Sequence, residues 1–65
     1  MIQEFARVLR EKIRTDMNNY ADDLAGGVCK DFAQYQKLCG MIQGLALAER
    51  YTLDLVEKVE KANDD

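Results

Sequence analysis

The fold is decided by residues 24–34, which read LAGGVCKDFAQ. Gly26 and Gly27 follow a leucine, and a glycine pair at that place ends a helix because glycine adopts the left-handed conformation at little cost. Asp31 stands three residues before Gln34, which is the spacing of a capping box. In that motif the carboxylate accepts hydrogen bonds from free backbone amides while the Gln34 side chain reaches back. The segment therefore predicts a helix end, a turn and a new helix.

Apolar residues before this segment recur with a helical period. They stand at steps of three or four residues, at Ile2, Phe5, Leu9, Ile13, Met17, Tyr20 and Leu24. Ala6 and Val8 widen the same stripe. This spacing is typical of an amphipathic helix and not of a strand. We expect one helix over residues 2–24 and a turn over residues 25–31.

A second helical pattern follows the turn, and we expect it to cover residues 32–62. Its expected core positions are Phe32, Tyr35, Leu38, Cys39, Ile42, Leu45, Ala46, Leu53, Val56 and Val59. The predicted fold is all-α: a single domain over residues 1–65 that forms a two-helix antiparallel hairpin. Because the second helix is the longer one, the first should cover it only to about Leu53 or Leu55. Val56 and Val59 are then expected to lack a partner within the chain.

The length of the chain predicts that the hairpin does not stand alone. A chain of 65 residues hides only about 60% of the surface that its unfolded form exposes, and such small domains usually need a partner. We therefore expect the hairpin to be completed by oligomerisation or by docking on a larger protein. No membrane association is expected, since the longest mostly apolar stretch, residues 38–48, is too short to span a bilayer.

The stretch over residues 38–48 is apolar on nearly every side of a helix, so one neighbouring helix cannot cover it. Gly40, Gly44 and Ala48 repeat every four residues within it. An interior glycine costs a helix about 1 kcal/mol relative to alanine. The glycines either make room for a bulky side chain of the first helix or allow a partner helix to approach. The predicted packing interface with a partner comprises Gly40, Gly44, Ala48, Ile42, Leu45, Val56 and Val59.

The charge of the chain does not favour nucleic acid overall, because nine basic and twelve acidic residues give a net charge of −3. Four basic residues nevertheless cluster near the start of the chain, at Arg7, Arg10, Lys12 and Arg14. They form either a solvated face or a contact patch, and in an antiparallel hairpin the arginines can face Asp54, Glu57 and Glu60. Glu49 is expected on or beside the core, where it needs an arginine of the first helix as its partner.

The residue types argue against an enzyme. The chain has no histidine, which excludes a Ser-His or Cys-His catalytic pair and a His-containing zinc site. Cys29 and Cys39 do not form a C-x-x-C pair, and we expect both to be reduced thiols without a function. Residues 25–30 lack the spacing of a phosphate-binding loop. We expect no catalytic residue, no cofactor and no metal site.

The run from Asp31 to Arg50, DFAQYQKLCGMIQGLALAER, resembles small proteins of tailed bacteriophages. Their shared pattern is D-[FY]-A-x-Y-x-x-L-x-G-x-I-x-G-L-x-x-A-x-R, and every fixed position of it is met here. The resemblance covers about a third of the chain, and it is a packing pattern more than a chemical motif. Since the genes of these proteins tend to lie among head and portal genes, it implies an accessory virion component. The expected place is the portal, the head–tail connection or the capsid, or else the cytoplasm of the bacterial host.

An alternative interpretation is a regulator that binds nucleic acid or a host protein. In size and architecture alone the predicted hairpin resembles the plasmid RNA-binding protein Rop, whose two chains make a four-helix bundle. A dimer would then display two copies of the basic patch. No aromatic residue is interleaved with that patch for base stacking, and acidic groups surround it. We therefore expect protein partners, either a second copy or a virion protein such as the portal.

Overall fold

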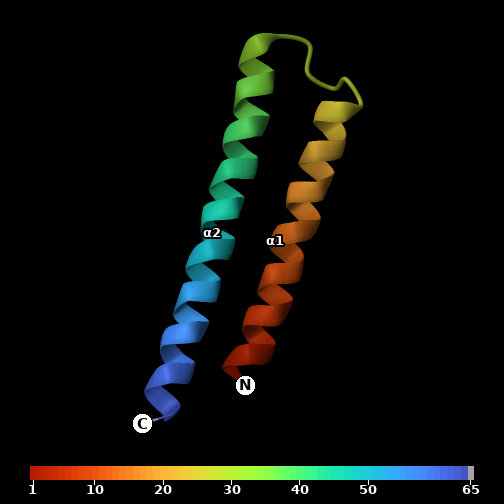
Figure 1. Ribbon diagram of the computed structural model, residues 1–65. Coiled ribbons are helices and arrows are strands. Elements are labelled where there is room, and N and C mark those ends of the chain that lie inside the picture. The colour runs from red at the N-terminus through yellow and green to blue at the C-terminus, as the bar shows by residue number, and fades with distance from the viewer. Residues whose placement is uncertain (65) are drawn as a thin grey trace.

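The chain forms an antiparallel hairpin of two helices (Figure 1). The structure is a computed structural model that describes residues 1–64. Helix α1 covers Ile2–Ala25 and helix α2 covers Phe32–Asp64, so each ends one or two residues beyond its predicted bound. The described residues contain no strand. The all-α hairpin predicted from the sequence is confirmed. Its dimensions of 53 × 16 × 11 Å are those of two helices lying side by side in a single layer.

The glycine pair ends α1 as the sequence predicts. The Gly26 amide donates to the Asp22 carbonyl at 2.8 Å, and the Val28 amide donates to the Asp23 carbonyl at 3.1 Å. Between them Gly27 has a φ of +78°, which lies in the left-handed region that side chains with a Cβ avoid. These bonds satisfy carbonyls that the end of a helix would otherwise leave free. Gly27 therefore lets the chain leave α1 within one residue.

Asp31 caps the start of α2. The Gln34 amide donates to Asp31 Oδ1 at 2.8 Å. The Gln34 side chain turns back, and its Oε1 accepts from the Lys30 amide at 2.8 Å. In a standard capping box this second bond goes to the capping residue itself; here it goes one residue further, so it also ties down the end of the connecting segment.

The two helices touch along a narrow line, and within the part of the chain that the structure describes three residues are buried: Ala6, Ile13 and Glu49. Half-buried side chains flank them, at Met17, Tyr20 and Leu24 on α1 and at Leu38, Cys39, Ile42, Leu45 and Val56 on α2. Several positions of the predicted apolar stripe and core are instead exposed, namely Ile2, Phe5, Leu9, Phe32, Tyr35, Ala46, Leu53 and Val59. Phe32 and Tyr35 lie where α2 extends past α1, and the others lie at the edges of a stripe that is wider than a single neighbouring helix can cover.

The N-terminal part of α1 shows how the stripe was misjudged. Ala6 and Ile13 are seven residues apart, which is two helical turns, and both face α2. Phe5 stands one residue before Ala6 and so points about 100° away around the helix. It is 66% exposed. The predicted stripe was correct in period but was centred too far toward the larger side chains.

The C-terminal overhang of α2 is shorter than predicted and begins later along the helix. Gln3 Nε2 donates to Glu60 Oε1 at 2.6 Å, so α1 reaches well past Leu55. Figure 1 shows that α2 extends past α1 at both ends, and at the connection the segment between the helices spans the distance from the end of α1 to the start of α2. The prediction treated the connection as a point, whereas residues 26–31 have a length of their own. Phe32 and Tyr35 lie on the overhang at the connection and stack on each other, with ring centroids 6.2 Å apart.

We expect alanine to have opposite effects on the free energy of unfolding at Gly27 in the turn and at Gly40 in α2. Gly27→Ala should lower the free energy of unfolding by about 1 to 2 kcal/mol, because alanine is strained in the left-handed region. Gly40→Ala is the control: a Cβ there meets no atom within 4 Å, so it should raise stability by up to about 1 kcal/mol. Urea denaturation followed by circular dichroism, at one protein concentration, measures both. Equal effects of the two substitutions would contradict this account of the turn.

Candidate interaction surface

Apolar side chains of both helices form a groove near the chain termini, which we call the terminal groove. Its lining residues are Ile2, Phe5, Ala6, Leu9, Thr52, Leu55, Val56 and Val59. None of them is charged. The one hydroxyl, on Thr52, donates to the Ala48 carbonyl at 2.8 Å and so is already satisfied within α2. The groove therefore presents an almost wholly apolar lining to its surroundings.

The terminal groove is open in the hairpin. Phe5 is 66% exposed and Leu55 is 61% exposed, and they stand on opposite sides of it. Aromatic and aliphatic side chains rarely gather on a free surface without a binding role. Sequence reasoning placed Phe5 on the apolar stripe of the first helix and did not single out Leu55. The register of the two helices, which brings these residues together, was the missing information.

The predicted interface residues divide into two groups. Ile42, Leu45, Ala48 and Val56 are half-buried, whereas Gly40, Gly44 and Val59 are exposed. Ideal Cβ atoms built on Gly40 and Gly44 meet no atom within 4 Å. The two glycines therefore do not make room for a side chain of α1, which was one of the two explanations for them. Of the seven residues, Val56 and Val59 line the terminal groove.

Glu49 is the buried charge of the hairpin, and two arginines of α1 neutralise it. Arg14 binds it in a bidentate manner, with Nε donating to Oε2 at 2.7 Å and Nη2 donating to Oε1 at 3.0 Å. Arg10 Nε donates to the same Oε2 at 3.3 Å. Hydrogen bonding from Arg14 lowers the pKa of Glu49, although burial acts in the opposite direction. The expected pairing of Glu49 with α1 is thus present, and it joins the middles of the two helices.

Three of the four basic residues near the start of the chain pair with carboxylates of the hairpin. Arg7 pairs within α1, with Glu4 and with Glu11, whose Oε1 accepts from Nη1 at 2.7 Å. Arg10 and Arg14 are engaged by Glu49. The expected pairing of these arginines with Asp54, Glu57 and Glu60 is wrong, because it assumed that equal ends of the two helices meet without allowing for the connection. Glu57 instead pairs with Lys61 at 3.0 Å.

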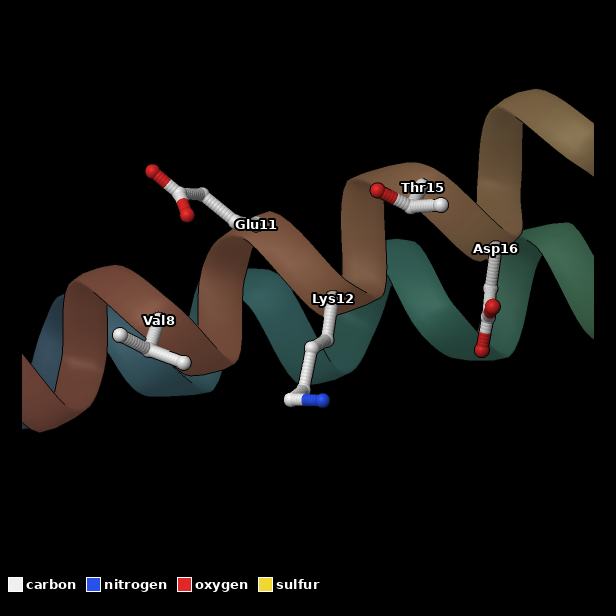
Figure 2. A pocket seen from close by; sticks show the side chains of 5 residues that line it. All are labelled: Val8, Glu11, Lys12, Thr15 and Asp16. Carbon is white, nitrogen blue, oxygen red and sulfur yellow. The ribbon is translucent and has the colours of Figure 1, made fainter.

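The outer side of α1 carries a shallow hollow that residues of this helix alone line. Figure 2 shows its lining residues, Val8, Glu11, Lys12, Thr15 and Asp16, all on one helix. Glu11 points away from Lys12 and Asp16 in this view, so the polar groups do not converge on one point. Lys12, the fourth basic residue, thus lies beside the acidic Asp16 and apart from the arginine pairs with Glu49.

The remaining chemistry-bearing side chains are also dispersed. Cys29 and Cys39 are half-buried free thiols. Within the part of the chain that the structure describes, no three Cys, Asp or Glu side chains gather in a way that could hold a metal ion. Over the same residues neither helix has an apolar stretch long enough to cross a bilayer. The surface features that stand out are therefore the terminal groove and the exposed residues of α2.

Comparison of the chain with protein-family models, curated proteins and solved structures finds no match.

The Glu49 pair predicts loss of stability in acid. A carboxyl whose pKa is lower in the folded than in the unfolded chain stabilises the fold above its unfolded pKa, about 4.3 for Glu. That contribution is lost as the pH falls through the lower, folded pKa. Thermal unfolding midpoints should therefore drop between about pH 5 and pH 3, and Glu49→Gln should lower the midpoint at neutral pH and flatten the profile.

Glu57→Gln is the matched control, since its pair with Lys61 is exposed on α2 alone. It should leave the acid profile nearly unchanged, because exposed pairs contribute little. If Glu57→Gln flattened the profile as much as Glu49→Gln, the buried pair would not be the source of the acid sensitivity.

Proposed function

We propose that the chain is a non-enzymatic structural protein that works by binding other proteins. The observation that carries this proposal is the terminal groove, an uncharged concave surface that both helices line and that nothing in the hairpin covers. Solvent exposure of such a surface is unfavourable by about 25 cal/mol per Å². A protein partner that covers it removes this cost.

The pattern of residues 31–50 supports a more specific role, as an accessory component of a tailed phage. The place of action would be the portal, the head–tail connection or the capsid. The pattern positions Leu38, Ile42 and Leu45 have a structural reason, since they are half-buried in the hairpin. Phe32 and Gly40 belong to the same pattern but are exposed and do not pack against α1. A contact with a larger virion protein would explain why such residues stand there.

Binding of nucleic acid in the manner of Rop is the weaker alternative. It requires cations that can neutralise phosphates, and Arg7, Arg10 and Arg14 already pair with carboxylates in the hairpin. The exposed aromatic pair, Phe32 and Tyr35, lies on α2 near the connection between the helices. These arginines lie on α1, toward the other end of the hairpin. No observation on the hairpin favours this alternative over protein binding.

Purified virions of a phage that encodes the chain provide the test. Mass spectrometry should detect the protein in particles at a fixed ratio to the portal or capsid subunit. A host-directed regulator would be made in infected cells but be absent from particles. Absence of the protein from particles that contain all other head components would contradict the proposal.

A matched pair of variants tests whether the exposed glycine side of α2 makes the virion contact. Gly40→Leu fills open space on α2 and should reduce incorporation about tenfold or more by overpacking a close contact, which corresponds to about 1.4 kcal/mol. Thr15→Leu adds a similar side chain to the outer side of α1 and should be incorporated normally. Both variants should remain helical by circular dichroism. Equal incorporation of the two would place the virion contact elsewhere.

A further inference from the structure

The hairpin exposes more surface than a folded chain of its mass normally does. Its accessible area is 5242 Å², whereas a folded monomer of 7.4 kDa is expected to expose about 4,200 Å². The excess is about 1,000 Å². Among the residues that the structure describes, no side chain is fully buried. Two helices by themselves therefore do not enclose a core.

Exposed apolar side chains gather on one side of the hairpin. The terminal groove contains Phe5 and Leu55 at about two-thirds exposure, with Ile2 46% and Val59 38% exposed beside them. Further along α2, Met41, Gly44, Ala48 and Tyr51 precede Leu55 at alternating steps of three and four residues. Such spacing places them along one stripe of a helix, and none of them is charged. α2 thus carries a second apolar stripe beside the one that packs on α1.

We infer that a second copy of the chain covers the terminal groove, so that two hairpins form a four-helix bundle. The area argues for this occupant: if each copy buries its excess, the two together lose about 2,000 Å², which is the size of a stable, specific interface. A two-fold dimer also presents the same apolar surface from both sides, so neither copy faces a charged lining. The inference deepens the proposed function by naming one protein partner, and rests on it only for the premise that the chain acts through protein contact.

The register of the hairpin selects the direction of the two-fold axis. Phe5 and Leu55 line the same groove, so they lie at the same level along the helices. A two-fold axis parallel to the helices leaves the position of every residue along the helix axis the same in both copies. It also places α1 of each copy over α2 of the other. Phe5 then packs against Leu55 of the second copy, twice in the dimer. An axis perpendicular to the helices and through the groove would overlap only the ends of the hairpins, which covers too little area.

A charge exchange between these two positions tests the inference. Analytical ultracentrifugation of the wild-type chain at about 50 μM should show a dimer, since interfaces of this size bind at micromolar affinity or better. Phe5→Glu and Leu55→Lys should each weaken the dimer about a hundredfold or more, because each places charge in an apolar contact. An equimolar mixture of the two variants should restore a heterodimer, which contains one Glu–Lys pair and one native Phe–Leu contact.

Val8→Glu and Leu47→Lys are the matched controls, because both positions are exposed and apolar but lie outside the groove. They should leave the wild-type dimer intact. A monomeric wild-type chain would overturn the inference, as would control variants that weaken the dimer as much as the groove variants do. Failure of the mixture to form a heterodimer would overturn the pairing of Phe5 with Leu55. All of these measurements use the isolated protein, so their failure is separate from absence of the protein in virions.

Discussion

Two helices can touch along one line only, and this constraint governs the whole molecule. Each helix buries a single narrow stripe against its neighbour, which is why burial among the described residues is confined to Ala6, Ile13 and Glu49. The other apolar side chains must lie at the edges of the contact or face outward. The exposed groove is therefore a direct consequence of having no third helix. The exposed apolar side chains that support binding are also the reason that the isolated hairpin is only marginally stable.

The buried Glu49 shows how the hairpin obtains a defined register in spite of its small core. Apolar contacts along a line tolerate sliding, since one aliphatic side chain replaces another with little change in free energy. A buried carboxylate does not tolerate it, because sliding would leave the charge without its arginines. The bidentate bond to Arg14 and the bond to Arg10 thus align the helices. The same alignment brings Phe5 opposite Leu55 across the terminal groove.

The local structure was predictable wherever neighbouring residues decide it. The end of α1 at the glycine pair, the cap of α2 by Asp31 and the bounds of both helices within two residues depend on hydrogen bonds between residues a few positions apart. Glu49 was also recognised as a charge that needs an arginine of α1. The predicted register was wrong because the register depends on the length of residues 26–31. A sequence pattern does not give the distance that such a segment spans along the helix axis. Phe5 and Leu55 consequently could not be identified as members of one groove.

The amino-acid sequence alone determined that this protein is an antiparallel pair of amphipathic helices with more apolar surface than a hairpin can bury. It did so because helical periodicity, glycine stops and capping residues act over a few positions of the chain. Only the tertiary structure decided which apolar residues are covered and which remain open, since that choice depends on the rotation and register of one helix against the other. Ala6 faces inward and Phe5 outward for this reason, although they are neighbours in the same stripe.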